Sequence, residues 1–345
     1  MCGAGAELLP ALFLSGFSLI EPLAAESCIW SQLRPLPAFQ PLQSRVTSRP
    51  RSGSSFVLPP VPSLLLAAVS IQGGAALAKS LFPLLGPPAV TSLRVGFAAL
   101  ILWLIWRPNV RQVNRAGWLA LLPYGVALGL MNLAYYLALE RIPLGLTVTL
   151  EFVGPLAVAV LSSRRAADFV WVGLAALGLL LIVPWPGQAS ALDPLGVALA
   201  LFAGVCWGIY IWAGQRVAGV FAGPQGVALG MTIAALSTLP FGAVMGAQHG
   251  AWTHLTPVVL LTALGVAVLS SALPYSLEMG ALRSLPARVF GVLMSLEPAV
   301  AALIGMVFLG EHLKVMQWLA IACVMAASVG VTLGAGRKAV PPIEV

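Results

Sequence analysis

The sequence predicts an all-α polytopic membrane protein, and three observations support this class. Hydrophobic residues make up 59% of the 345 residues and charged residues only 8%, whereas about a quarter of the residues of a soluble domain are charged. Beyond residue 60, apolar stretches of about 20 residues follow one another, and this length suits a helix that crosses a bilayer core roughly 30 Å thick. No stretch alternates apolar and polar residues as the strands of a membrane barrel do, so helices must satisfy the backbone in lipid.

Loop signals divide the apolar region into about ten expected transmembrane helices. Short polar, Pro-containing or Gly-containing segments separate them. The expected spans are 62–82, 87–106, 117–139, 142–163, 169–184, 195–215, 225–246, 256–282, 286–309 and 313–335. Successive spans cross in opposite directions, so the loops between them lie on alternate sides of the membrane.

Residues 1–60 differ in composition from the rest of the chain. They are rich in Pro, Ser and Arg and show no periodic pattern, so we expect them to be disordered or to lie upstream of the natural start of translation. The apolar run 8–20 has no preceding Lys or Arg and no convincing cleavage site after it, which argues against a signal peptide. Residues 337–345 are expected to form a cytoplasmic tail.

The basic residues predict the orientation of the chain. One side holds Arg34, Arg45, Arg49, Arg51, Arg107, Arg111, Arg115, Arg164, Arg165, Arg216, Arg283, Arg288, Arg337 and Lys338. The opposite side holds only Lys79, Arg141 and Lys314. The positive-inside rule places the richer side and both termini in the cytoplasm, which requires an even number of spans. Because the basic residues are spread over loops, the net charge of +7 does not indicate nucleic-acid binding.

The apolar region is predicted to contain two repeats, residues 61–190 and residues 191–336. Four features of the first half recur 143 positions later in the second half. They are Ala138-Leu139 with Ala281-Leu282, Pro143 with Pro286, Pro155 with Pro298, and Asp168 with Glu311. A unit of five spans enters the membrane from the other side when it is copied, so the repeats would be inverted and would support alternating access to a site between them.

Glu151 is the first candidate for binding substrate or a proton. It lies near the middle of the fourth expected span, and Thr147 and Pro155 share its helical face one turn away on either side. Pro155 cannot donate a hydrogen bond to the carbonyl of Glu151, so we expect this carbonyl and the carboxylate to face the same cavity. The alternative is a structural Glu that bonds to a neighbouring helix.

Two further ionisable residues lie inside expected spans. Glu297 and Pro298 hold the related place in the second half, where Glu297 has either a cavity role or a packing role. Arg94 keeps its charge at any physiological pH and therefore requires an anion. Glu151, Glu297 and a substrate carboxylate are the candidates, so a structural ion pair and a substrate contact both remain open.

Weaker candidates follow helical spacing. They are Gln72 and Lys79 on the first span, Asn132 and Tyr135 on the third, and Ser271, Tyr275 and Glu278 on the eighth. Tyr is common at membrane interfaces, and Lys79 and Glu278 are close enough to span ends to reach water, so structural roles are favoured for these residues.

The sequence contains no sign of a metal site, a cofactor or a nucleotide-binding loop. Its four Cys are scattered and its three His lie in or beside predicted loops. ATP-driven pumping would therefore need a separate subunit, and no such ATPase subunit is evident. An ion gradient or the gradient of the substrate itself remains as the energy source.

Three segments resemble the EamA-domain proteins of the drug/metabolite transporter superfamily. These are SIQGGAALAKS at 70–80, LEFVGP at 150–155, and the second-half segment that contains Leu-Glu-Pro at 296–298 and Leu-Gly-Glu at 309–311. Within the superfamily they are similar to the threonine and homoserine exporters of the bacterial inner membrane. The resemblance covers about residues 61–335.

The resemblance implies ten helices in two inverted five-helix repeats in the bacterial cytoplasmic membrane. It also implies efflux of small neutral or hydroxylated amino acids, coupled to proton entry. A zwitterionic substrate would present its ammonium to a carboxylate such as Glu151 and its carboxylate to Arg94. The alternatives are a broader metabolite or drug exporter of the same superfamily and, from another class, a membrane-embedded receptor or enzyme.

Overall fold

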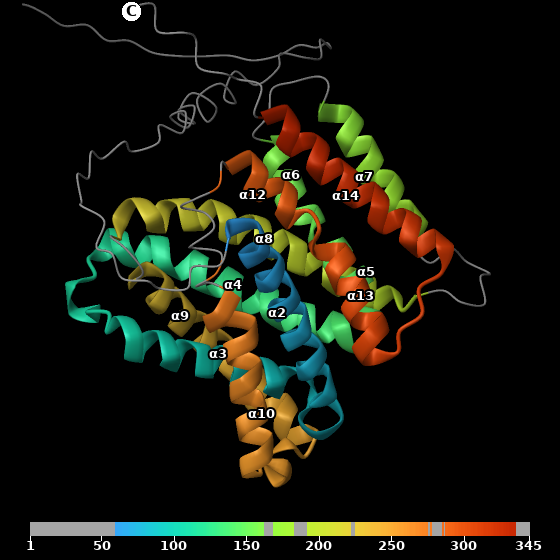
Figure 1. The fold of residues 1–345 in the computed structure, drawn as a ribbon. Coiled ribbons are helices and arrows are strands. Elements are labelled where there is room, and N and C mark those ends of the chain that lie inside the picture. The colour runs from blue at the N-terminus through green and yellow to red at the C-terminus, as the bar shows by residue number, and fades with distance from the viewer. Residues whose placement is uncertain are drawn as a thin grey trace, which may run out of the picture. The chain divides into compact units, whose positions relative to one another are not determined.

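The computed structural model describes residues 59–161, 168–182, 192–221, 225–274, 277, 285 and 287–335. Every secondary-structure element in this part of the chain is helical, which confirms the predicted all-α class (Figure 1). The elements are α2 (Pro60–Ser80), α3 (Phe82–Trp106), η1 (Val110–Gln112), α4 (Arg115–Arg141), α5 (Leu144–Glu151), α6 (Val153–Leu161), α7 (Asp168–Ile182), α8 (Pro194–Val220), α9 (Gln225–Gln248), η2 (Ala251–His254), α10 (Pro257–Ala267), η3 (Val268–Ala272), α12 (Ala287–Met294), α13 (Glu297–Leu309) and α14 (Val315–Ala335).

Seven helical segments of the described residues are long and apolar enough to cross a membrane. They are Pro60–Ser80, Phe82–Trp106, Arg115–Arg141, Pro194–Val220, Gln225–Gln248, Val289–Leu309 and Val315–Leu333. The other three of the ten expected spans correspond to the shorter apolar helices Leu144–Val158, Phe169–Leu181 and Pro257–Ser271. Of the about ten spans expected, seven are therefore helices of full spanning length in the described part of the chain.

Several helices begin at residues that satisfy or remove free backbone N–H groups. Asn114 accepts a hydrogen bond from Gly117 N at 2.8 Å where α4 begins. Asp193 accepts one from Leu195 N at 2.9 Å where α8 begins. Pro298 lies in the first turn of α13. A backbone N–H in this turn has no acceptor within the helix, so the N–H that proline lacks costs no hydrogen bond. These caps set the helix starts within the short loops.

Two expected spans are broken at related positions. Helix α5 ends at Glu151 and α6 begins at Val153, and α12 ends at Met294 before α13 begins at Glu297. Helix α5 is eight residues long, and Pro143 precedes its first residue. Pro155 explains the first break, because it cannot donate to the carbonyl four residues earlier.

The helices pack closely along small residues and expose apolar side chains outward. Helix α4 packs against α8 and α9, α5 packs against α13, and α7 lies beside α14 (Figure 1). On the outer surface Leu104 and Val307 are 76% and 72% exposed. Such apolar exposure would be costly in water and is the surface that lipid requires.

Candidate functional site

A cavity of about 300 Å³, here called the polar cavity, brings together residues from both halves of the chain. Six of the predicted site residues line it, namely Gln72, Arg94, Asn132, Tyr135, Glu151 and Glu297. The other lining residues are Ile71, Ala75, Leu128, Met131, Val148, Trp207, Tyr210, Ser270, Pro274, Phe290 and Met294. Two acidic groups and one guanidinium group therefore share one enclosed space among apolar helices.

Glu151 lies on the wall of this cavity at the last residue of α5. It is only 8% exposed, and its carboxylate has no hydrogen-bond or ion-pair partner within the described part of the chain. The carbonyl groups at the end of a helix carry partial negative charge. A carboxylate in this position favours a cation or a proton as its partner, because a buried ionised group is costly unless it is paired.

The backbone carbonyl of Glu151 lies close to α8. A Cβ atom placed on Gly204 of α8 would stand 2.7 Å from this oxygen, so the carbonyl faces the backbone of Gly204. Gly204 lines a different, apolar cavity together with Gly154. The absence of a side chain at Gly204 allows α8 to approach the backbone at the break between α5 and α6.

Arg94 of α3 is held in place by α4. Its guanidinium donates to Tyr136 Oη at 3.0 Å and to Asn132 Oδ1, and its central carbon lies 5.1 Å from the centroid of the Tyr136 ring. Asn132 in turn donates from Nδ2 to the carbonyl of Leu128 at 2.7 Å. This chain of hydrogen bonds orients a planar cationic group at the cavity wall, which is the geometry that suits a carboxylate.

Glu297 occupies the opposite kind of helix end from Glu151. It is the first residue of α13 and is 6% exposed. The helix start places Glu297 where a helix dipole favours negative charge. Glu297 lines the polar cavity, and both its predicted roles, in the cavity and in helix packing, stay predictions.

Sequence reasoning missed several residues of the cavity wall. Trp207 packs edge-on against Phe152 with ring centroids 5.4 Å apart, and Tyr210 stacks on Tyr124 at 4.8 Å. Ser270 lines the cavity in place of its predicted neighbour Ser271. Both serines lie in η3, a π-helical segment, so the ordinary helical spacing used for the prediction chose the wrong one of the pair.

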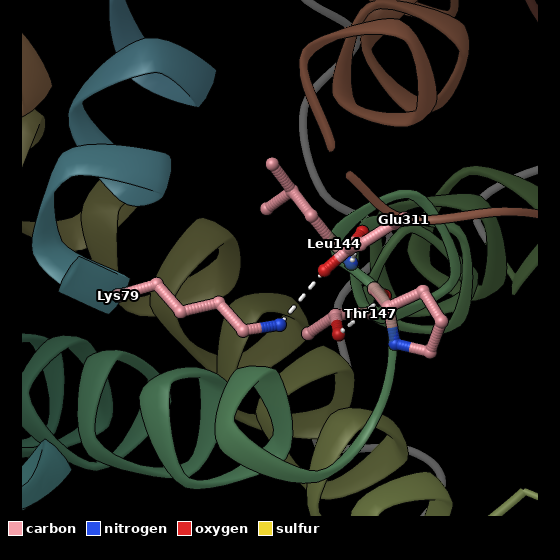
Figure 2. A network of polar contacts seen from close by, with 5 residues as sticks. Lys79, Leu144, Thr147 and Glu311 are labelled. Atoms are coloured by element: carbon pink, nitrogen blue, oxygen red, sulfur yellow. Dashed lines mark hydrogen bonds and ion pairs between the residues drawn. The ribbon is translucent and has the colours of Figure 1, made fainter. Parts of the chain in front are cut away.

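Lys79 does not line the polar cavity but forms an ion pair near the end of α2 (Figure 2). Its Nζ lies 2.7 Å from Glu311 Oε1, while Glu311 Oε2 accepts a hydrogen bond from Leu144 N at 2.8 Å. Thr147 donates to the carbonyl of Pro143 at 3.0 Å in the same first turn of α5. Glu311 therefore joins α2, α5 and the end of α13, and the expectation that Lys79 reaches toward water is replaced by this pairing.

Two predicted site residues, Tyr275 and Glu278, lie outside the described residues, as do residues 1–58 of the N-terminal segment.

A second ion pair joins Arg141 to Asp193 with a distance of 2.9 Å between Nη1 and Oδ2. It connects the end of α4 to the start of α8. Within the described ranges, both ion pairs link a residue of the first half to a residue of the second.

Comparison with known proteins places the chain in a family. The EamA-like transporter family matches residues 194–333, which include Ser270, Glu297 and Glu311. Threonine/homoserine exporter RhtA of Escherichia coli K12 is 54% identical over 274 residues, which cover 79% of this chain and 91% of the relative. This chain belongs to the RhtA family. The RhtA of Salmonella typhimurium SL1344 is 52% identical over 289 residues, covering 83% of this chain and 96% of the relative.

Membership of the RhtA family confirms the resemblance inferred from the three sequence segments. The two alignments extend over 274 and 289 residues, or 79% and 83% of the chain. The relatives' printed names describe exporters, and the matching family model describes transporters.

Proposed function

We propose that this chain exports threonine- or homoserine-like amino acids across the bacterial cytoplasmic membrane. The main support for the proposal is that Glu151 and Arg94 both line the polar cavity. The relatives in the RhtA family are named for the export of these amino acids. Their similarity over most of the chain supports the same substrate class here.

The chemistry of the cavity suits a zwitterion. The α-ammonium group would pair with Glu151, and the α-carboxylate would pair with the guanidinium of Arg94. A volume of about 300 Å³ is at the lower end of the usual range for small-molecule sites, roughly 300–1,000 Å³. The cavity is therefore suited to one small amino acid.

Proton coupling follows from the same carboxylate. A single Glu151 side chain can hold a proton or an ammonium group but not both at once. If the proton enters from outside and displaces the substrate, each proton that moves inward drives one amino acid outward. The energy source is then the proton gradient, and the exchange needs no cofactor.

The access pathway is inferred from the two halves. The recurrence of Pro143 and Pro155 as Pro286 and Pro298, each 143 positions later, supports two inverted five-helix units that together cross the membrane ten times. The sparse basic residues at Lys79 and Arg141 support an outer location for both ion pairs, with the termini in the cytoplasm.

Efflux from proteoliposomes tests the proposal. Vesicles loaded with labelled threonine, homoserine, alanine, leucine or lysine are diluted with and without an inward pH gradient. We expect rapid efflux of threonine and homoserine that is accelerated when the outside is acidic. Equal efflux of all five amino acids would favour a broader exporter, and efflux no faster than from empty-membrane controls would contradict the proposal.

A further inference from the structure

A cavity of about 390 Å³ lies between α6 and α8, and its lining residues differ from those of the polar cavity. They belong to segment 153–161 of α6 and segment 201–212 of α8, and each of them is apolar or glycine. This cavity is here called the apolar groove. Its lining suits hydrocarbon rather than an amino acid, which needs partners for two charged groups.

The apolar groove opens on the outer surface of the protein. At its floor the two helices approach closely, since a Cβ atom placed on Gly208 of α8 would stand 3.2 Å from Val158 Cγ2 of α6. Its rims are exposed, because Leu161 of α6 is 85% exposed and Val205 of α8 is 58% exposed. In a chain that spans a membrane, such a groove faces the lipid.

The length of the apolar groove matches one leaflet of the membrane. Its lining residues on α8 follow one another at helical spacing from Leu201 to Trp212, so they share one face of the helix. At 1.5 Å per residue these two positions are roughly 17 Å apart along the axis. The hydrocarbon of one leaflet is about 15 Å deep, which is half of the bilayer core. One acyl chain can therefore lie along the groove.

A cationic group lies at one end of the apolar groove. Arg216 follows Trp212 by one helical turn, and its central guanidinium carbon lies 3.6 Å from the centroid of the Trp212 ring. Both side chains are exposed, and within the described part of the chain no carboxylate pairs with Arg216. A guanidinium group held over an aromatic ring suits a phosphate, which it can bind through two hydrogen bonds.

The position of Arg216 along the chain indicates which leaflet supplies the lipid. Arg216 belongs to the side that is rich in basic residues, which the positive-inside rule places in the cytoplasm. Anionic lipids give the cytoplasmic leaflet a negative surface potential that attracts Lys and Arg. A zwitterionic headgroup carries its own ammonium group, which would weaken this attraction.

We propose that the apolar groove binds an acyl chain of an anionic phospholipid of the cytoplasmic leaflet, whose phosphate is bound by Arg216. Trp207 and Tyr210 line the polar cavity from the opposite face of α8. The lipid therefore packs on the outer face of a helix that forms part of the cavity wall. This binding does not depend on which amino acid is exported.

The test measures the melting temperature of the purified full chain, freed of lipid in detergent, while one of two lipids is added. Dioleoyl phosphatidylglycerol and dioleoyl phosphatidylcholine have the same acyl chains and differ in headgroup charge. Arg216→Gln removes the cation but keeps a side chain that can cover Trp212. Ala157→Phe fills the groove, because Ala157 lines it and is exposed.

Two matched controls change exposed residues that do not line the apolar groove. Arg111→Gln removes a cation from η1, on the same predicted side of the membrane as Arg216. Ala176→Phe adds the same aromatic ring to the exposed surface of α7. These controls separate binding at the groove from general attraction of lipid to the protein surface.

For the unmodified chain we expect half-maximal stabilisation at an about fivefold lower concentration of phosphatidylglycerol than of phosphatidylcholine. Arg216→Gln should abolish this difference, and Ala157→Phe should weaken the effect of both lipids. Neither control should change the response. The melting temperature without lipid should stay unchanged in Arg216→Gln, since the side chain is exposed.

Four outcomes would overturn the inference. They are equal stabilisation of the unmodified chain by both lipids, equal losses for Arg216→Gln and Arg111→Gln, equal losses for Ala157→Phe and Ala176→Phe, and a lower lipid-free melting temperature of Arg216→Gln with a preserved preference for phosphatidylglycerol. The second outcome would indicate general surface attraction, and the last would make Arg216 a structural residue.

Discussion

Lys79 and Glu311 form an ion pair between residues 232 positions apart, with Nζ 2.7 Å from Oε1 (Figure 2). The second carboxylate oxygen of Glu311 accepts the backbone N–H of Leu144, the first residue of α5. The last residue of the same helix is Glu151. Eight helical residues, about 12 Å in length, thus separate the ion pair from the cavity carboxylate.

Removal of Glu311 should destabilise the chain more than removal of Lys79. Lys79→Ala removes only the ion pair, whereas Glu311→Ala also removes the acceptor at the start of α5, which adds about 0.5–2 kcal/mol. Glu311→Gln should lie between them, because an amide oxygen still accepts from Leu144 N. Melting temperatures of the purified variants check this order, and equal losses for Lys79→Ala and Glu311→Ala would show that Glu311 does not stabilise α5.

Glu151→Gln should leave the protein in the membrane but abolish pH-dependent exchange. The amide has nearly the same shape and can neither release a proton nor neutralise an ammonium group. We expect at least tenfold slower counterflow of threonine and no response to a pH gradient. The control is Glu140→Gln, since Glu140 is exposed at the end of α4. A normal pH response in Glu151→Gln would exclude Glu151 as the proton carrier.

Arg94→Lys should weaken substrate binding while the charge is retained. Lysine cannot donate from a planar group to Tyr136, Asn132 and a carboxylate together, so we expect the half-saturation concentration to rise about tenfold, or roughly 1.4 kcal/mol. Tyr136→Phe removes one of these hydrogen bonds and should have a smaller effect. If Arg94→Lys lowers the yield of folded protein but leaves the half-saturation concentration unchanged, Arg94 is structural.

Gly154→Ala should destabilise the chain because α6 and α8 are in backbone contact there. An added Cβ atom at Gly154 would meet the carbonyl group of Gly204. Overpacking of this kind costs about 1–3 kcal/mol. Gly173 of α7 is the matched control, since a Cβ atom there meets nothing within 4 Å and alanine favours a helix. Equal melting temperatures for the two variants would contradict the close approach.

The ionised carboxylate of Asp193 should stabilise the folded state at neutral pH, and this stabilisation should be lost in strong acid. The hydrogen bond from Arg141, followed by that from Leu195 N, lowers the pKa of Asp193 from its ordinary value of 3.8. A lowered pKa means that the ionised form favours the folded state. This contribution is complete above pH 3.8 and is lost as the pH falls through the lowered value.

Asp193→Asn tests this pH dependence, because asparagine can still cap α8 while the charge is lost. The melting temperature of the variant should be lower than that of the unmodified chain at neutral pH, and the difference should shrink in strong acid. A difference that stays constant with pH would show that the charge of Asp193 is not involved.

The sequence alone predicted most of the charged part of the site. Ionisable side chains inside apolar spans are costly in lipid, so Arg94, Glu151 and Glu297 could be recognised without any structure. Gln72 and Asn132 were weaker candidates from helical spacing, for which a structural role was favoured. The breaks at Pro155 and Pro298 were also predictable, since proline removes a backbone donor. All five side chains line the same cavity.

What the residues could not reveal was how the helices are rotated and which of them meet. The choice of Ser270 over Ser271 depends on the π-helical turn of η3, and the pairing of Lys79 with Glu311 depends on where α2 and α13 end in space. The solvent preference of a side chain is a property of its own chemistry, so composition determined the membrane setting and the candidate charges. A partner or a cavity wall is a property of packing between distant segments, and only the tertiary structure decided it.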